Sequence, residues 1–406
     1  MKILIVCEYY YPERVLVTEI AERLVRDGHR VTVLTGLPNY NLPGGRVPKA
    51  YRSREKRCEE INGVQVIRSN VLGRGANKVR LLLNYFSFQI SATTKAKRLE
   101  PDFDVVLCYQ LTPILQMHPA IRYCQKHRKP LVCYCLDLAP ESGSRIVKRI
   151  PFLPDLYDRY SRWAYQQCDC IAVTTRGFSD YLQSRHGIQA ERIEYLPQHA
   201  SPELLKQNLS KKIDARIEFL FAGNMGNGPR LDTILMATQK LLEWGKKNFR
   251  VTFIGNGSAK TKLMSMARDM KLDDHVRFLE GVPMEKMPSV YRTADALLIT
   301  LRKGQITVPG KLQAYMATGK PIIGAMDGSG REMLEEAGCG ICANAEDADG
   351  LANQMAEYMK DPCAFEHMGI NGRRYFRKHF TLDTYITGLE AILSQSMKSG
   401  RKDREI

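Results

Sequence analysis

Short apolar runs alternate with amphipathic stretches along almost the whole chain, and this alternation limits the fold more than any other feature. The first run, KILIVC, is followed by a helix-like stretch and then by the run RVTVLT. The pattern continues to PIIGA at residues 321–325. Such alternation is typical of parallel strands joined by crossover helices. We therefore expect an α/β fold built from doubly wound parallel sheets.

Length and a polar break predict two such domains. The 406 residues exceed one ordinary domain. Residues 199–214 are polar, and the strand pattern begins again after them with RIEFLFAGN. We predict a first domain over residues 1–198 and a second over residues 199–381. A helix over 382–397 should pack back on the first domain, and 398–406 should form a charged, disordered tail.

The chain is strongly basic, with 60 Lys and Arg against 44 Asp and Glu and a net charge of +16. This excess implies an anionic partner: nucleic acid, an acidic membrane surface or a phosphorylated substrate. The charge is spread over both halves without a recognisable nucleic-acid-binding module, so we expect no nucleic-acid partner. No run is long enough to span a bilayer, and MKILIVC is typical of a strand rather than a signal peptide.

The 11 cysteines lie largely in apolar runs such as VVLC and LVCYC. Zinc ligands usually come as paired knuckles, and neither CYC nor CDC has that spacing. We interpret the cysteines as core thiols of a reducing compartment, in preference to a disulfide framework, and expect no metal site.

Two glycine-rich loops follow strands of the second half. FAGNMG places Gly223, Asn224 and Gly226 after one strand, and FIGNG places Gly255 after the next. Glycines there let a diphosphate approach the backbone. From topology alone, the loop at Val282 is expected to meet a nucleobase.

The segment VPGKL predicts a phosphate site at a helix N-terminus, formed by the backbone of Pro309, Gly310 and Leu312 with the Lys311 amine. Arg230 and Arg302 are second candidate cations for the same diphosphate. The alternative is that these three side chains are merely solvated surface charges.

Carboxylates and amides follow strands of the first half. Asp137 and Glu141 lie four residues apart after a strand, where they could orient or deprotonate a sugar hydroxyl or form a helix N-cap and first-turn acid. Glu13, Asn39 and Tyr40 follow the first two strands and suit acceptor contacts, although loop polarity explains them equally well.

Two stretches of the first half, at 78–98 and 145–165, combine basic and aromatic residues. Each could be a helix with a wide core face. Their presence together in a cationic protein favours contact with a membrane surface.

Taken together, several motifs resemble family 4 glycosyltransferases of the GT-B fold, and specifically the branch that builds bacterial capsule and O-antigen repeat units. The motifs are YYYPE, GLPNYN, CLDLAPES, FAGNMG, FIGNG, the aspartate of TADALLI, and VPGKLQAYMATGKPII. The resemblance covers nearly the whole chain and implies two Rossmann-like domains facing each other across a cleft.

The resemblance also implies a function. The second domain would bind a nucleotide-sugar donor, a UDP-sugar, with Lys311 on its diphosphate. The first would bind a polyprenyl-linked acceptor at the inner face of a bacterial cell membrane, so the enzyme would be cytoplasmic and peripheral. Such enzymes use no metal or other cofactor and usually retain the sugar's configuration.

The chain departs from the family pattern at four positions. Asn224 and Pro229 correspond to an arginine and a lysine of the family's donor site. Where the family carries two glutamates, this chain has Ile306 and Ala314. This departure keeps two alternatives open: a catalytically inactive GT-B scaffold of a polysaccharide assembly complex, and a nucleotide-sugar epimerase on the same fold.

Overall fold

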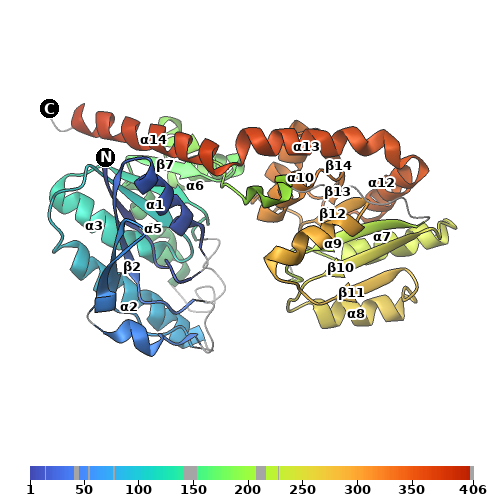
Figure 1. Ribbon diagram of the computed structural model, residues 1–406, viewed down its shortest axis with the longest axis horizontal. Helices are drawn as coiled ribbons and strands as arrows, with labels where there is room; N and C mark the ends of the chain where they lie inside the picture. Colours follow the sequence, from blue (N-terminus) through green and yellow to red (C-terminus); the bar gives the residue numbers. More distant parts are fainter. Residues whose placement is uncertain are drawn as a thin grey trace. The chain divides into compact units, whose positions relative to one another are not determined.

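The computed structural model describes residues 1–13, 15–40, 45–53, 55–75, 78–140, 153–206, 216–226 and 228–402 (Figure 1). The chain divides into two compact units. The first contains Met1–Pro197 together with the chain from Tyr385 onward, and the second contains Gln198–Thr384.

The first unit is built on an eight-stranded sheet of order β3-β4-β2-β1-β5-β6-β7-β8. All neighbouring strands are parallel except β3 and β4, which are antiparallel. The strands are β1 (Lys2–Val6), β2 (Arg30–Gly36), β3 (Cys58–Ile61), β4 (Val64–Ser69), β5 (Val105–Gln110), β6 (Leu131–Cys135), β7 (Cys170–Val173) and β8 (Ile193–Tyr195). The helices are α1 (Leu16–Arg26), α2 (Lys78–Ala96), α3 (His118–His127), α5 (Leu153–Gln166) and α6 (Arg176–His186).

The second unit has a six-stranded, wholly parallel sheet of order β11-β10-β9-β12-β13-β14. Its strands are β9 (Ile217–Ala222), β10 (Phe249–Ile254), β11 (Val276–Leu279), β12 (Ala296–Thr300), β13 (Ile322–Ala325) and β14 (Gly340–Ala343). Its helices are α7 (Asp232–Glu243), α8 (Lys260–Asp269), α9 (Met287–Thr293), α10 (Gly310–Thr318), α11 (Gly328–Glu336), α12 (Ala348–Lys360) and α13 (Glu366–His379).

The four inner strands of the second sheet, β9, β10, β12 and β13, are buried on both faces, which explains their largely apolar sequences. In β9, Phe219 and Phe221 belong to one core cluster with α7, α8 and α12, whereas Leu220 and Ala222 belong to another with α10 and α13. Alternate residues of a strand point to opposite faces, so each face needs its own layer of helices. The prediction of doubly wound sheets is confirmed, and the one antiparallel strand, β3, corrects it at an edge of the first sheet.

The last helix, α14 (Leu382–Lys402), lies beside the N-terminus of the chain (Figure 1). The ring of Tyr385 packs edge-on against Tyr134 of β6, and Glu390 forms an ion pair of 2.7 Å with His29. The helix continues past residue 397 to Lys402, so the start of the predicted disordered tail at 398 is wrong. The sequence KSGRK contains no proline, and basic side chains are favourable near a helix C-terminus.

Among the described residues, no helix is long and apolar enough to cross a bilayer. Within the same ranges, no three His, Cys, Asp or Glu side chains are grouped so that they could hold a metal ion. The cysteines are free thiols, and most are buried. Their placement in the core is the one predicted from the apolar runs.

Strands β9 and β12 separate toward their carboxyl ends. Their ladder contains only the pairs Ala296–Phe219 and Leu297–Leu220. Beyond it, the hydroxyl of Tyr315 on α10 accepts a hydrogen bond from the Ala222 N–H (2.9 Å) and donates one to the Ala222 carbonyl (3.2 Å). This side chain therefore fixes α10 to the end of β9.

Replacing Tyr315 by Phe should lower the free energy of unfolding by about 1–3 kcal/mol, because both backbone groups of Ala222 lose this partner. The measurement is urea unfolding. Tyr291→Phe is the matched control, because the Tyr291 ring packs edge-on against Tyr315 and its hydroxyl makes no hydrogen bond to a described residue. Equal losses in the two variants would show that the hydroxyl of Tyr315 does not hold α10 in place.

Candidate functional site

Lys311 lies in the first turn of α10, which begins after Pro309. Its Nζ is 3.7 Å from the centroid of the Phe221 ring and has no hydrogen-bond partner among the described residues. Burial lowers the pKa of this amine to about 7. A buried amine without an acceptor is unfavourable unless an anion joins it, and perturbed groups of this kind are typical of functional sites.

Gly223 makes room for this amine. It follows β9 with φ +142°, and a Cβ there would lie 2.9 Å from Lys311 Nζ. Any side chain at this position would push the lysine away from the strand end. The predicted phosphate loop and the predicted lysine are thus direct neighbours.

Gly255 is required by the packing of its loop against the loop at Gly223. It has φ +143°, and a Cβ there would lie 2.0 Å from the Gly223 carbonyl oxygen. The two loops also bond through their backbones, because Met225 N–H donates to the Asn256 carbonyl at 2.8 Å. Packing of one loop on the other therefore requires glycine at 255 with or without a ligand.

The remaining donor candidates differ in what they can offer. Asn224 and Gly310 are exposed, Gly226 and Val282 are half-buried, and the Leu312 N–H already donates to the Pro309 carbonyl at 2.9 Å. Arg230 forms ion pairs with Asp232 (3.0 Å) and Glu346 (2.7 Å). These two carboxylates compete with any phosphate for its guanidinium.

In the first unit, Glu13 holds the loop that carries Asn39 and Tyr40. Its Oε1 accepts hydrogen bonds from the backbone N–H of Asn39 (2.6 Å) and of Tyr40. The Asn39 side chain in turn bonds Leu37 and Asn84 of α2. Glu13 and Asn39 are buried, so their hydrogen bonds shape this loop from within, whereas the Tyr40 ring stacks on Tyr9.

Asp137 ties together the loops that follow β5 and β6. Its Oδ2 accepts hydrogen bonds from the Thr112 N–H (3.1 Å) and hydroxyl (2.9 Å), and Oδ1 makes none to a described residue. No helix begins at Asp137 within the described chain, which stops at residue 140 before resuming at 153. Glu141 lies outside the described residues.

Glu8 is a candidate that the sequence analysis missed. It follows β1, the strand from which the first sheet is built outward in both directions, through β2 and through β5. Ligands of such sheets bind where the strand order reverses. Its carboxylate is buried, neither oxygen has a hydrogen-bond partner among the described residues, and burial raises its pKa to about 8. An acidic residue directly after a buried strand was the signal that could have identified it.

Arg74 accompanies Glu8 and was also missed. Its guanidinium lies over the rings of Tyr9, Tyr40 and Tyr85 at 5.6, 5.0 and 5.6 Å. It donates hydrogen bonds to the hydroxyls of Tyr9 (2.6 Å) and Tyr85 (3.2 Å). The predicted acceptor residue Tyr40 therefore belongs to an aromatic group that surrounds an arginine.

The two stretches considered for membrane contact correspond to α2 and, in part, to α5. Helix α2 exposes several apolar side chains, namely Val79, Leu83, Phe86 and Ile90, and α5 exposes Leu156. Residues 145–152 of the second stretch lie outside the described residues.

Comparison with known families agrees with this architecture. Residues 14–199 match the "Glycosyl transferase 4-like domain" model, and residues 205–375 match the "Glycosyl transferases group 1" model.

Two curated relatives resemble this chain in sequence. The chain is 25% identical over 158 residues to the GDP-mannose-dependent alpha-(1-6)-phosphatidylinositol monomannoside mannosyltransferase of Mycolicibacterium smegmatis, a match that spans 38% of this chain and only 40% of that relative. It is 23% identical over 359 residues to WcaI of Escherichia coli, a protein named for glycosyl transfer in colanic acid biosynthesis, covering 79% of this chain and 82% of that one.

The solved structure of Anabaena HepE in complex with UDP superposes with a TM-score of 0.70 at 14% identity, covering 97% of this chain and all of that one (100%). Likeness at this identity shows the fold. The fold is GT-B, and the two halves of the chain are glycosyltransferase domains of the group 1 and 4-like families.

Replacing Gly255 by Ala should destabilise the second unit by about 2 kcal/mol or more, because the new methyl group meets the Gly223 carbonyl at a positive φ. Gly226→Ala is the control, since its methyl group would lie no closer than 3.7 Å to Asn224 and should change stability by less than about 0.5 kcal/mol. Thermal unfolding measures both. Similar melting temperatures for the two variants would contradict the packing of one loop on the other.

Glu8→Gln should alter how stability depends on pH. The unfolded glutamate ionises near pH 4.5, whereas the folded one ionises near pH 8. The raised pKa means that the contribution of Glu8 to stability is fully present below pH 4.5 and is lost as the pH rises toward 8, by at most about 1.4 kcal/mol per pH unit.

The variant should not show this loss. Its free energy of unfolding, measured with urea at a series of pH values, should therefore rise relative to that of the wild type between pH 4.5 and 8. Glu55→Gln, at an exposed glutamate, is the control and should follow the wild type. Parallel curves for wild type and Glu8→Gln would refute burial of a neutral Glu8.

Proposed function

We propose that this chain is a glycosyltransferase that moves a sugar, an amino or deoxy sugar, from a UDP-sugar to a polyprenyl-linked or glycan acceptor in the biosynthesis of a capsule, O-antigen or similar cell-surface polysaccharide. The observation that carries the proposal is the buried Lys311 amine, without a hydrogen-bond partner among the described residues, at the carboxyl end of β9. The family-model matches, the naming of WcaI and the UDP bound to HepE support it.

The proposed chemistry follows from the negative charge that the leaving diphosphate acquires. When the bond between sugar and diphosphate breaks, negative charge grows on the diphosphate oxygens. A protonated Lys311 in a desolvated position would stabilise that charge more strongly than a lysine in water. The N-terminus of α10 and the loops at Gly223 and Gly255 would add backbone N–H groups, and no metal or cofactor is needed for this step.

Under this proposal the first unit binds the acceptor, at the inner face of the bacterial membrane. Asp137 has one carboxylate oxygen engaged by Thr112, which leaves Oδ1 to orient or deprotonate a sugar hydroxyl. Glu13, Asn39 and Tyr40 shape the acceptor loop, and α2 and α5 present basic and apolar side chains to the lipid. Retention of configuration is what the family resemblance favours.

One observation favours a second candidate function. Ile306 and Ala314, where the family has glutamates, are half-buried apolar residues. In addition, the Gln313 amide, a nearby polar side chain, already bonds the Gln198 carbonyl at 3.0 Å. A GT-B scaffold without activity would tolerate these residues, as would an epimerase acting on a free nucleotide sugar.

A panel of UDP- and GDP-sugars should identify the donor by thermal protection. At 100-fold excess over the dissociation constant, one UDP-sugar should raise the melting temperature by about 5 °C. Lys311→Met should fold, because the buried amine disfavours the unliganded state, and should lose most of the protection. Lys303→Met, at an exposed lysine of the preceding loop, is the control and should keep it.

Protection by no UDP-sugar, or equal protection of wild type and Lys311→Met, would refute the donor assignment. Protection by a GDP-sugar alone would change the assigned nucleotide from UDP to GDP and would leave the assigned donor site unchanged. Incubating the protected enzyme with membranes then separates the alternatives: transfer of labelled sugar to lipid supports the transferase, a changed free nucleotide sugar indicates an epimerase, and an unchanged donor indicates a scaffold.

A further inference from the structure

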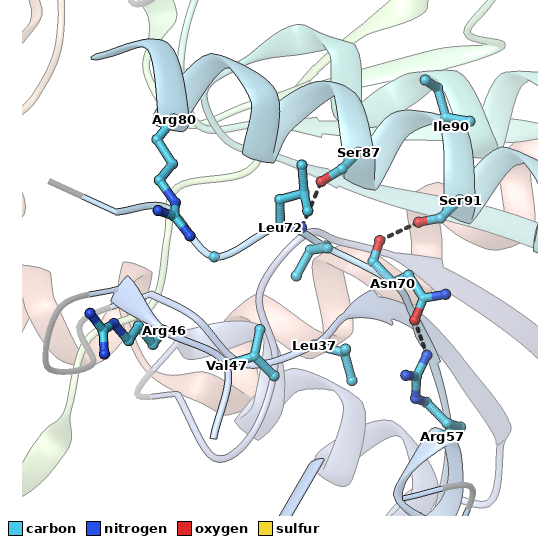
Figure 2. A pocket seen from close by; sticks show the side chains of 12 residues that line it. Leu37, Arg46, Val47, Arg57, Asn70, Leu72, Arg80, Ser87, Ile90 and Ser91 are labelled. Atoms are coloured by element: carbon cyan, nitrogen blue, oxygen red, sulfur yellow. Dashed lines mark hydrogen bonds between the residues drawn. The ribbon is translucent and has the colours of Figure 1, made fainter. Parts of the chain in front are cut away.

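The first unit contains a hollow of about 880 Å³ along one side of α2 (Figure 2). Its walls are α2, the segment that follows β4, and residues near the start of the chain segment 45–53. The lining residues are Leu37, Arg46, Val47, Arg57, Asn70, Val71, Leu72, Gly73, Arg80, Ser87, Ile90 and Ser91.

The hollow lies at the ligand-binding edge of the sheet. Leu37 directly follows β2, and Asn70 directly follows β4, so both mark the carboxyl ends of neighbouring parallel strands. Asn84 of α2 links this region to the acceptor loop, since its side chain bonds both Asn39 and the Leu72 carbonyl. The hollow is therefore connected by hydrogen bonds to a residue that we assign to the acceptor.

The charge of the hollow is positive. Its lining includes three arginines, Arg46, Arg57 and Arg80, and no acidic residue. Arg57 donates to the Asn70 side-chain oxygen, while its Nε is buried without a hydrogen-bond partner among the described residues. The neighbouring Lys95 adds a further cation, and its pKa is lowered by burial and by the charge of Arg57.

Between the arginines the surface is apolar. Figure 2 shows the side chains of Leu37, Val47 and Leu72 between Arg46 and Arg80 on one side and Arg57 on the other. Leu72, in the segment after β4, and Ile90, on α2, are 54% and 66% exposed, so the lining also presents apolar side chains to solvent. An anionic head joined to a hydrocarbon chain would satisfy both kinds of surface.

We propose that this hollow binds the diphosphate head of a lipid-linked acceptor, with the first part of its hydrocarbon chain on Leu72 and Ile90. A diphosphate carries at least two negative charges, which suits three arginines better than the single charge of a membrane phosphodiester. The inference rests on the proposed function, because it makes the hollow part of the acceptor site.

The test uses farnesyl diphosphate, a short soluble lipid diphosphate, with the full-length protein in titration calorimetry. The triple variant Arg46→Gln, Arg57→Gln, Arg80→Gln should bind it at least roughly tenfold more weakly than the wild type, because each charge-assisted contact is lost. Arg26→Gln, which removes an exposed arginine from α1, should bind as the wild type does. The melting temperature of the triple variant verifies that it is folded.

Two further ligands distinguish the sources of phosphate. Inorganic pyrophosphate should bind the wild type more weakly than farnesyl diphosphate, because it has no chain to cover the apolar surface. Equal affinity of wild type and triple variant for farnesyl diphosphate would overturn the proposal. Loss of binding to phosphatidylglycerol vesicles with unchanged farnesyl diphosphate binding would also overturn it and assign the arginines to the membrane surface.

Donor protection measured in the same variants keeps the two proposals separate. If a UDP-sugar protects the protein but the triple variant binds farnesyl diphosphate as tightly as the wild type does, only the inference about the hollow fails. If farnesyl diphosphate binding depends on the arginines but no nucleotide sugar protects the protein, the hollow is supported and the proposed transferase is not.

Discussion

The second unit depends on the separation of β9 from β12 beyond two residue pairs. Parallel strands that part at their carboxyl ends leave backbone groups and apolar surface to be covered. Helix α10 covers them, with the Tyr315 hydroxyl bonded to Ala222 and Leu312 in the core. The position of this helix brings Lys311 against Phe221 and Gly223, so the core that holds the unit together also sets the electrostatics of the site.

In the first unit, too, side chains at the strand ends hold the neighbouring backbone in place, but these side chains are acidic. At its strand ends, carboxylates organise the loops: the buried Glu13 bonds the backbone at Asn39 and Tyr40, and the half-buried Asp137 bonds Thr112. Glu8 stands apart, since burial alone dominates its raised pKa and no described residue bonds its oxygens. The second unit thus contains a buried amine, Lys311, without a hydrogen-bond partner among the described residues. The first unit contains a buried acid, Glu8, and an arginine, Arg74, that lies among tyrosine rings.

The sequence predicted most of the fold because strands buried on both faces have continuous apolar sequences with a clear alternation of helices. It missed β3 and β14, which are edge strands with half-exposed residues and no such run. Lys311, Gly223 and Gly255 were predicted as a group because loops after parallel strands meet at one edge. Their separate roles were not predicted, since the contact of Gly255 with the Gly223 carbonyl depends on how the two loops pack. Glu8 and Arg74 were missed for a related reason: burial and aromatic contacts, rather than spacing, distinguish them from other loop residues.

The decisive measurement for the donor site is the pKa of Lys311, by ¹⁵N-lysine NMR titration of the protein with and without saturating UDP. We predict a pKa of about 7 in the unliganded protein, where burial disfavours the charged amine. With UDP bound we predict a pKa well above that value, because the diphosphate stabilises the charge. A pKa that UDP leaves unchanged would contradict the assignment of Lys311 to the donor diphosphate.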